Sequence, residues 1–379
     1  MVYRVAVVGT GAPEQPDRYA MAYRHAQAYD RLERCELIAC ADIVRDNAEA
    51  FARRFDLAAG SIYEDYETML SEVEPDIVSV CTPPKTHAEI VMKCAESGVI
   101  DAIHCEKPMA GTWKGCREMV ATCERTGVQL TFNHQRRFAA PYRKAKTLLD
   151  DGRIGTLQRI EIGGQDLLDY GTHLFDMCGY MTDQRPVEWV LAKVDCRNPT
   201  RKYGLYQESR ALAWWRYESG VDGFAATGEA ELVRCELRLE GADGTIEVGP
   251  EDGPSARVRV DGSDWERVET GRDGVWRPQP HPLDRLAERV PIGPDRLFSE
   301  PTYVDRALAD VVEALDADEP STLSAANALQ TTEMIFGAWE SARRRQRVRL
   351  PLEIEGNPLQ AMIDGDSGTL EMIDGPTRT

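Results

Sequence analysis

Residues 1–134 alternate between two periodicities, and this alternation constrains the fold more than any other feature of the chain. Apolar runs of strand length, such as 3–8 and 76–81, are followed by stretches with helical spacing, one of which stops at Gly98. Strands that alternate with helices form a parallel sheet with helices on both faces. The pattern therefore predicts an α/β domain over residues 1–134.

Beyond about residue 150 the pattern changes to a run of strands separated by turn signals such as Asp243-Gly244. We expect residues 135–379 to form an α+β domain with a large, mostly antiparallel open sheet, closed by two amphipathic helices at 303–315 and 325–342. A loop rich in Pro and Gly is expected over 271–300. The expected strands are 156–162, 187–196, 210–218, 223–240, 245–248, 256–260 and 265–269.

The charge balance argues against two classes of partner. The chain has 45 Lys and Arg against 64 Asp and Glu, which gives a formal net charge of −19. Such a surface does not suit the phosphates of nucleic acids or an anionic membrane. No apolar run is long enough for a transmembrane helix, a signal peptide is not apparent, and the ten cysteines lack CxxC spacing. We therefore expect a cytoplasmic protein with reduced thiols and no metal site.

The first apolar run leads directly into the turn Gly9-Thr10-Gly11. In a dinucleotide-binding fold the first glycine permits a tight bend, and the second lets the backbone approach a pyrophosphate that rests on a helix N-terminus. An insertion then precedes the next helical stretch and leaves further phosphate contacts open. Asp42 closes the second strand, where an acid can hydrogen-bond the adenosine ribose. The sequence predicts a Rossmann domain that binds NAD, and Arg45 keeps NADP open.

Three further patches carry a resemblance when they are taken together. Residues 82–87 (Thr-Pro-Pro-Lys-Thr-His) and 106–108 (Glu-Lys-Pro) each follow an apolar run, at strand ends where open α/β sheets bind ligands. Asp169 lies four residues before His173 in the second half of the chain. In this order, behind a glycine turn, these elements resemble the Gfo/Idh/MocA family, named for glucose–fructose oxidoreductase and inositol dehydrogenase. The likeness extends over most of the chain.

The resemblance implies an NAD(P)-dependent dehydrogenase that takes a hydride from a CH–OH group of a sugar, inositol or related polyol. It implies that Lys107 faces nicotinamide and substrate and that Glu106 helps to hold the cofactor. Asp169 and His173, at helical spacing, would project from one face, and Asp169 would hydrogen-bond a neighbouring hydroxyl. We expect His173 to act as acid and base and Lys107 as hydrogen-bonding electrophile and relay, although the two roles can be exchanged.

The remaining candidates also come from the resemblance. Thr82, Pro83 and His87 match positions that line the cofactor, and Arg137 lies where the chain crosses into the second domain. The alternatives are structural: a turn and helix cap at 82–87, and an interdomain hydrogen-bond set around Arg137. The predicted cofactor-binding residues are Gly9, Thr10, Gly11, Asp42, Thr82, Pro83, His87, Glu106 and Lys107, and the predicted substrate-binding residues are Lys107, Arg137, Asp169 and His173.

Two other functions stay open. An NAD-dependent glycoside hydrolase or lyase that uses transient oxidation would share this site without accumulating NADH. A non-enzymatic NAD-binding regulator would be expected to lack Lys107, Asp169 and His173. The resemblance also implies a homodimer or homotetramer, formed through the open face of the second sheet. The segment between Gly155 and His173 is shorter than is usual in the family, which predicts a more open or differently walled substrate site.

Overall fold

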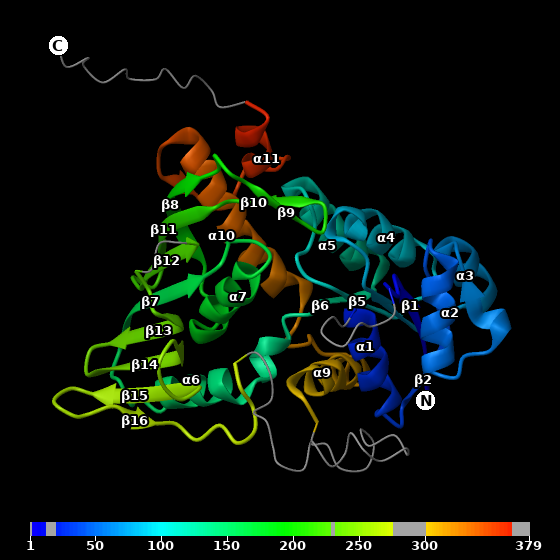
Figure 1. Ribbon diagram of the computed structural model, residues 1–379, viewed down its shortest axis with the longest axis horizontal. Coiled ribbons are helices and arrows are strands. Elements are labelled where there is room, and N and C mark those ends of the chain that lie inside the picture. Colours follow the sequence, from blue (N-terminus) through cyan, green and yellow to red (C-terminus); the bar gives the residue numbers. More distant parts are fainter. Residues whose placement is uncertain (1, 13–19, 229–231, 276–300, 366–379) are drawn as a thin grey trace.

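The computed structural model describes residues 2–12, 20–228, 232–275 and 301–365, and they build two sheets of different kinds (Figure 1). The N-terminal sheet has six parallel strands in the order β3-β2-β1-β4-β5-β6. The C-terminal sheet has nine strands in the order β16-β15-β14-β13-β7-β12-β11-β8-β17. This architecture confirms the predicted fold class.

The N-terminal sheet is wound in both directions from its centre. The chain moves outward from β1 to β3 and then returns to β4, so the strand order reverses between β1 and β4 and leaves a crevice at their carboxyl ends. β4 is buried at all four positions, as expected for a parallel strand covered on both faces. The elements are β1 (Tyr3–Val8), α1 (Met21–Asp30), β2 (Cys35–Ala41), α2 (Arg45–Arg54), β3 (Ile62–Tyr63), α3 (Tyr66–Val73), β4 (Ile77–Val80), α4 (Pro84–Glu96), β5 (Ala102–Cys105), α5 (Trp113–Thr126) and β6 (Gln129–Phe132).

The C-terminal sheet carries helices on one face and is open on the other. Its neighbouring strands are antiparallel except for β7 and β12. β11 alternates along its length, so Trp215 is buried whereas Trp214 is 47% exposed on the open face. The elements are α6 (Ala140–Asp150), β7 (Leu157–Gly164), α7 (Gly171–Met181), β8 (Val187–Asp195), β11 (Arg210–Tyr217), β12 (Asp222–Gly228), β13 (Cys235–Gly241), β14 (Gly244–Pro250), β15 (Ala256–Val260), β16 (Glu266–Arg267), α10 (Ala325–Arg344) and β17 (Val348–Arg349).

Two sequence predictions are corrected here. The single strand expected over 223–240 is two strands, β12 and β13, which lie on opposite sides of β7. The helix expected at 303–315 forms as α9 (Tyr303–Ala317) but does not close the second sheet. Its apolar stripe, including Val304 and Leu308, packs against α1 and against Tyr3 and Val5 of β1. Periodicity reveals that a helix has a buried face but not which sheet it covers.

Several elements escaped the sequence reading. These include α3, α6 and α11 (Pro358–Ile363), together with a small hairpin made of β9 (Thr200–Lys202) and β10 (Leu205–Gln207). Figure 1 shows the hairpin reaching from the second half of the chain toward α5. Most of the loop predicted over 271–300, and most of the insertion after the glycine turn, lie outside the described residues. No helix in the described ranges has the length and apolar character to cross a membrane.

Candidate active site

The glycine turn at the end of β1 has the backbone that its sequence requires. Gly9 and Gly11 have φ values of 84° and 70°, a region that side chains disfavour. A Cβ atom at Gly9 would lie 2.6 Å from Cγ2 of Thr82, so the turn and the residues after β4 touch at this point. Thr10, between the glycines, is fully buried. The turn therefore leaves its backbone accessible at the crevice, as a pyrophosphate-binding turn needs.

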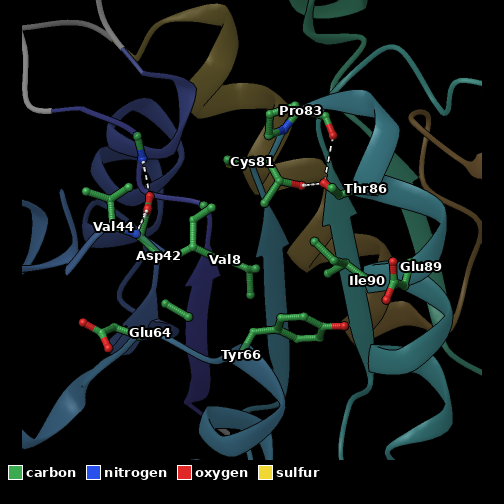
Figure 2. A pocket seen from close by; sticks show the side chains of 15 residues that line it. Val8, Asp42, Val44, Glu64, Tyr66, Cys81, Pro83, Thr86, Glu89 and Ile90 are labelled. Carbon is green, nitrogen blue, oxygen red and sulfur yellow. Dashed lines mark hydrogen bonds between the residues drawn. The ribbon is translucent and has the colours of Figure 1, made fainter. Parts of the chain in front are cut away.

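Asp42 fastens this turn to the end of β2. Its Oδ2 atom accepts hydrogen bonds from the Gly11 amide at 2.9 Å and from the Thr10 hydroxyl at 3.0 Å, while Oδ1 accepts one from the Val44 amide at 2.9 Å. Figure 2 shows Asp42 at the wall of the crevice, across from the residues that follow β4. Asp42 thus holds the turn, and its contact with a ribose stays a prediction.

A cavity of about 400 Å³ opens between these two strand ends. This volume lies within the range of small-molecule sites. Thr82 and Pro83 line it as predicted, and the Thr86 hydroxyl donates to Thr82 Oγ1 at 2.8 Å (Figure 2). A glycine cradle, a carboxylate and mostly apolar walls suit a dinucleotide. The other lining residues include Val8, Val44, Glu64, Tyr66, Glu89 and Ile90.

His87 was predicted to line the cofactor, but the structure buries it completely. Its Nε2 atom lies 2.7 Å from the Thr82 carbonyl oxygen, and its Nδ1 atom lies 3.0 Å from the carbonyl oxygen of Pro108. Burial lowers the pKa of His87, although these carbonyls oppose the shift. The imidazole therefore braces the loop after β4 against the loop after β5, because a helix that starts at Pro84 turns this residue inward.

Glu106 also points into the protein. Its Oε1 atom accepts hydrogen bonds from His25 Nε2 at 3.0 Å and from Asn133 Nδ2 at 2.6 Å, and its Oε2 atom accepts one from the Lys107 amide at 3.2 Å. Burial raises the pKa of Glu106, but His25 and Asn133 outweigh it and hold that pKa near 2. His25 escaped sequence reasoning, since nothing in its local pattern links it to a residue 81 positions away. Glu106 thus fixes the loop that carries Lys107.

Lys107 and Asp169 meet between the two halves of the chain. The Lys107 ammonium donates to the Asp169 backbone carbonyl at 2.8 Å and to Asp169 Oδ1 at 3.0 Å. The Lys107–Pro108 peptide is cis. Asp169 lies in the turn before α7 rather than within the helix. Burial raises the pKa of Asp169, but Lys107 and Lys202 outweigh it and leave the pKa below its ordinary value.

Lys202 is a second cation at this carboxylate, and the sequence analysis did not single it out. It lies at the end of β9, with Nζ 3.1 Å from Asp166 Oδ2 and 3.3 Å from Asp169 Oδ2. A lysine in a polar stretch carries no local signal of such a contact. Two lysines and two carboxylates therefore meet in one cluster.

His173 lies in the first turn of α7 and is 6% exposed. Burial, together with the charges of Arg136, Lys107 and His134, lowers its pKa well below the ordinary value. Its Nδ1 atom is buried and makes no hydrogen bond among the described residues. The ring is therefore neutral at neutral pH and has a nitrogen that the protein leaves unsatisfied.

Arg137 has a different place from the one predicted. Its guanidinium makes two hydrogen bonds to the buried carboxylate of Asp176, at 2.8 and 2.7 Å, and a third to the Thr322 carbonyl. Arg137 is only 4% exposed, so it is an interior ion pair and not a substrate contact. Its neighbour Arg136 influences His173 instead and pairs with Glu236 at 3.0 Å. These contacts match the structural alternative for Arg137, which is a set of hydrogen bonds between the two domains.

A family model matches the N-terminal half of the chain. Residues 3–134 match the family described as an oxidoreductase family with an NAD-binding Rossmann fold. These residues therefore match the Gfo/Idh/MocA family model. The Gfo/Idh/MocA match confirms the resemblance seen in the sequence and the expectation of an NAD-binding domain. The matched region ends where β6 leads, through a short 3₁₀ turn (Gln135–Phe138), into the second half of the chain.

Curated relatives match parts of the chain. It is 30% identical over 198 residues to D-glucoside 3-dehydrogenase of Escherichia coli, which covers 47% of this chain and 53% of the relative. It is 28% identical over 178 residues to inositol 2-dehydrogenase of Rhizobium meliloti, which covers 43% and 52%. A third relative, 2,7-anhydro-N-acetylneuraminate hydratase of Mediterraneibacter gnavus, is 37% identical over 110 residues, 29% of this chain and 28% of the relative. The chain spans about half the length of the first two.

Solved structures of oxidoreductases extend the likeness to the whole fold. An aldose–aldose oxidoreductase from Caulobacter crescentus, solved with glycerol, superimposes with a TM-score of 0.71 at 20% identity, over 92% of this chain and 100% of that one. An inositol dehydrogenase homologue from Azotobacter vinelandii, solved with NADH and myo-inositol, gives 0.70 at 19% identity, over 92% and 97%. At these identities the likeness establishes the fold of both halves.

Proposed function

We propose that the protein is an NAD-dependent dehydrogenase that oxidises a CH–OH group of a sugar, inositol or related polyol. One observation carries the proposal: the Lys107 ammonium lies 3.0 Å from Asp169 Oδ1, so a residue of the NAD-binding half meets one from the second half. The charge of Lys107 also acts on the buried imidazole of His173 and helps to lower its pKa. The named dehydrogenases among the relatives support the same reaction class.

The nicotinamide of bound NAD would supply the hydride acceptor. The backbone at Gly9 and Gly11 would hold the pyrophosphate, and Asp42 would accept hydrogen bonds from the ribose. A carboxylate there disfavours the extra phosphate of NADP, which supports NAD as the preferred cofactor.

The side chains divide the proton chemistry between them. As the carbinol carbon loses hydride, its hydroxyl loses a proton, and neutral His173 can accept that proton. The Lys107 ammonium donates a hydrogen bond to the reacting oxygen and stabilises the charge that develops there. Asp169 orients Lys107 and accepts a hydrogen bond from a neighbouring hydroxyl. The exchange of roles between Lys107 and His173 stays open.

A screen of sugars, inositols and sugar acids tests this function. Each compound is incubated with the protein and either NAD or NADP, and reduced nicotinamide is followed by absorbance. We expect NADH to accumulate with at least one polyol, faster than NADPH does. Binding of NAD without reduction by any compound in the screen would contradict the proposal.

A second candidate function is supported by the hydratase among the relatives. This candidate, an NAD-dependent glycoside hydrolase or lyase, would use the same residues for a transient oxidation and return the hydride before product release. Product analysis by chromatography separates the two, because here the substrate disappears while NADH does not accumulate.

We also propose that the chain forms a homodimer or homotetramer through the open face of the second sheet. Trp214, Leu191 and Leu212 are 47%, 41% and 37% exposed there, and Trp214 pairs directly with Leu191 across β11 and β8. Large apolar side chains gathered on one exposed face are typical of interaction surfaces.

A further inference from the structure

The β9–β10 hairpin brings a second lysine to the predicted active site. Lys202, at the end of β9, lies 3.1 Å from Asp166 Oδ2 and 3.3 Å from Asp169 Oδ2. The other carboxylate oxygen of Asp169 accepts from Lys107 at 3.0 Å. One carboxylate therefore lies between two ammonium groups that come from different halves of the fold.

The hairpin is anchored where this contact is made. Leu205 is 6% exposed, and a Cβ atom built on Gly111 would lie 3.1 Å from its Cδ2 atom. A Cβ atom on Gly204, at the tip of the hairpin, would lie 3.4 Å from the side-chain methylenes of Lys85. The hairpin thus rests on the N-terminal half close to the loop of Lys107. This packing holds Lys202 over the site, although 37% of its side chain remains exposed.

We propose that Lys202 is a positioning residue, which shares the carboxylate of Asp169 so that Lys107 can turn from that carboxylate to the reacting oxygen. The inference rests on the proposed function. If Lys107 left Asp169 without a second cation nearby, a largely buried carboxylate would lose its compensating charge, which is costly. With Lys202 in place, Asp169 stays paired while Lys107 moves.

The surrounding charges determine what removal of Lys202 does. Lys202 bridges Asp166 and Asp169, and Lys107 pairs with Asp169, so two lysines balance two carboxylates. Without Lys202, Lys107 is the remaining ion-pair partner of Asp169 among the described residues, so the Lys107 ammonium is held more tightly at that carboxylate. On the far side of the site, His173 faces the charges of Arg136, Lys107 and His134. Arg136 pairs with Glu236 and His134 with Asp176, so neither of them replaces Lys202.

Three variants test this in turnover. In Lys202→Met we expect kcat to fall about tenfold with little change in the affinity for NAD. We also expect the rising limb of the kcat–pH profile to move alkaline by about half a unit, because a nearby positive charge is lost. Lys202→Arg should restore both values. Lys114→Met, at an exposed lysine of α5, should match the wild type. A wild-type kcat and pH profile in Lys202→Met would overturn the proposal.

A second measurement does not depend on turnover. Acetic anhydride acylates only neutral amines, so the rate of Lys107 acetylation in the folded protein, read by mass spectrometry, reports how firmly its charge is held. We expect this rate to fall about threefold in Lys202→Met and to recover in Lys202→Arg. An unchanged or faster rate would overturn the proposal. If no polyol reduces NAD, the proposed function fails, whereas this comparison still decides the role of Lys202.

Discussion

Lys107 and Asp169 are 62 residues apart and follow strands of different sheets, yet Lys107 Nζ donates to Asp169 Oδ1 at 3.0 Å. The contact is made because each residue lies in a loop that leaves its sheet toward the other half of the chain. It joins the crevice of the NAD-binding half to the first turn of α7, where His173 lies.

Replacement of Lys107 should separate binding from chemistry. In Lys107→Met the ammonium that contacts the reacting oxygen is lost, so turnover should fall at least about a hundredfold, the usual contribution of one proton-transfer group. NAD affinity, measured by calorimetry, should stay within about twofold, because the glycine turn and Asp42 are untouched. Lys114→Met, at an exposed lysine of α5, is the control. Near-normal turnover in Lys107→Met would contradict the assignment.

Replacement of Asp42 should change cofactor preference. Asp42→Ala removes the predicted ribose acceptor, so the affinity for NAD should fall more than that for NADP. Both should also decrease somewhat, since Asp42 holds the Gly11 amide and the Thr10 hydroxyl. Asp42→Asn keeps an acceptor oxygen for the turn and isolates the effect of charge. Equal losses for the two cofactors in Asp42→Ala would refute the ribose role.

The buried pair of His25 and Glu106 should make stability depend on pH. The pKa of His25, which burial lowers but Cys81 and Glu106 raise, is about 10 against an ordinary 6.5. Its stabilisation is therefore complete below pH 6.5 and is lost as the pH rises toward 10. For Glu106, with a pKa of about 2 against 4.5, stabilisation is present above pH 4.5 and is lost as the pH falls toward 2.

Urea unfolding checks this expectation. His25→Leu leaves the buried carboxylate of Glu106 without its charged partner, so the free energy of unfolding at pH 6 should fall by about 3 kcal/mol. The difference between wild type and this variant should shrink steadily from pH 6.5 toward pH 10. A difference that stays constant over that range would show that the pair does not carry the charges inferred for it.

Charge introduced on the open sheet face should dissociate the proposed oligomer. Trp214→Glu places a carboxylate among exposed apolar side chains, and analytical ultracentrifugation should then detect a smaller species than in the wild type. Val2→Glu, at an exposed apolar residue of the other half, should leave the sedimentation unchanged. An oligomer that survives in Trp214→Glu would place the interface elsewhere.

The sequence predicted those parts of the site that depend on local pattern. The glycine turn and Asp42 lie at the crevice, because strand ends in a parallel sheet meet at one edge. Thr82 and Pro83, which also line the crevice, were expected only from the family resemblance. Asp169 and Lys107 were expected near one another through the family resemblance, and their contact agrees with that expectation. Their catalytic roles remain predictions.

What the sequence left undetected depends on long-range packing. His25 and Lys202 contact carboxylates that lie far away along the chain, and no local spacing predicts those contacts. Arg137 looked available because it lies at a crossing between domains, but the partner that buries it, Asp176, is on a later helix. The run 223–240 looked like one strand since both of its parts favour strands, whereas the insertion of β7 between them is a property of the sheet.

The packing of α9 on the first sheet means that the chain crosses between its halves more than once. It leaves the N-terminal half after β6, returns with α9 to cover β1, and crosses again into α10. Two domains joined by one linker can move relative to each other or be exchanged as modules. Here the chain connects the two halves several times. A fragment cut at residue 134 would expose the apolar surface that α9 covers, and the three crossings restrict how far the two halves can move apart.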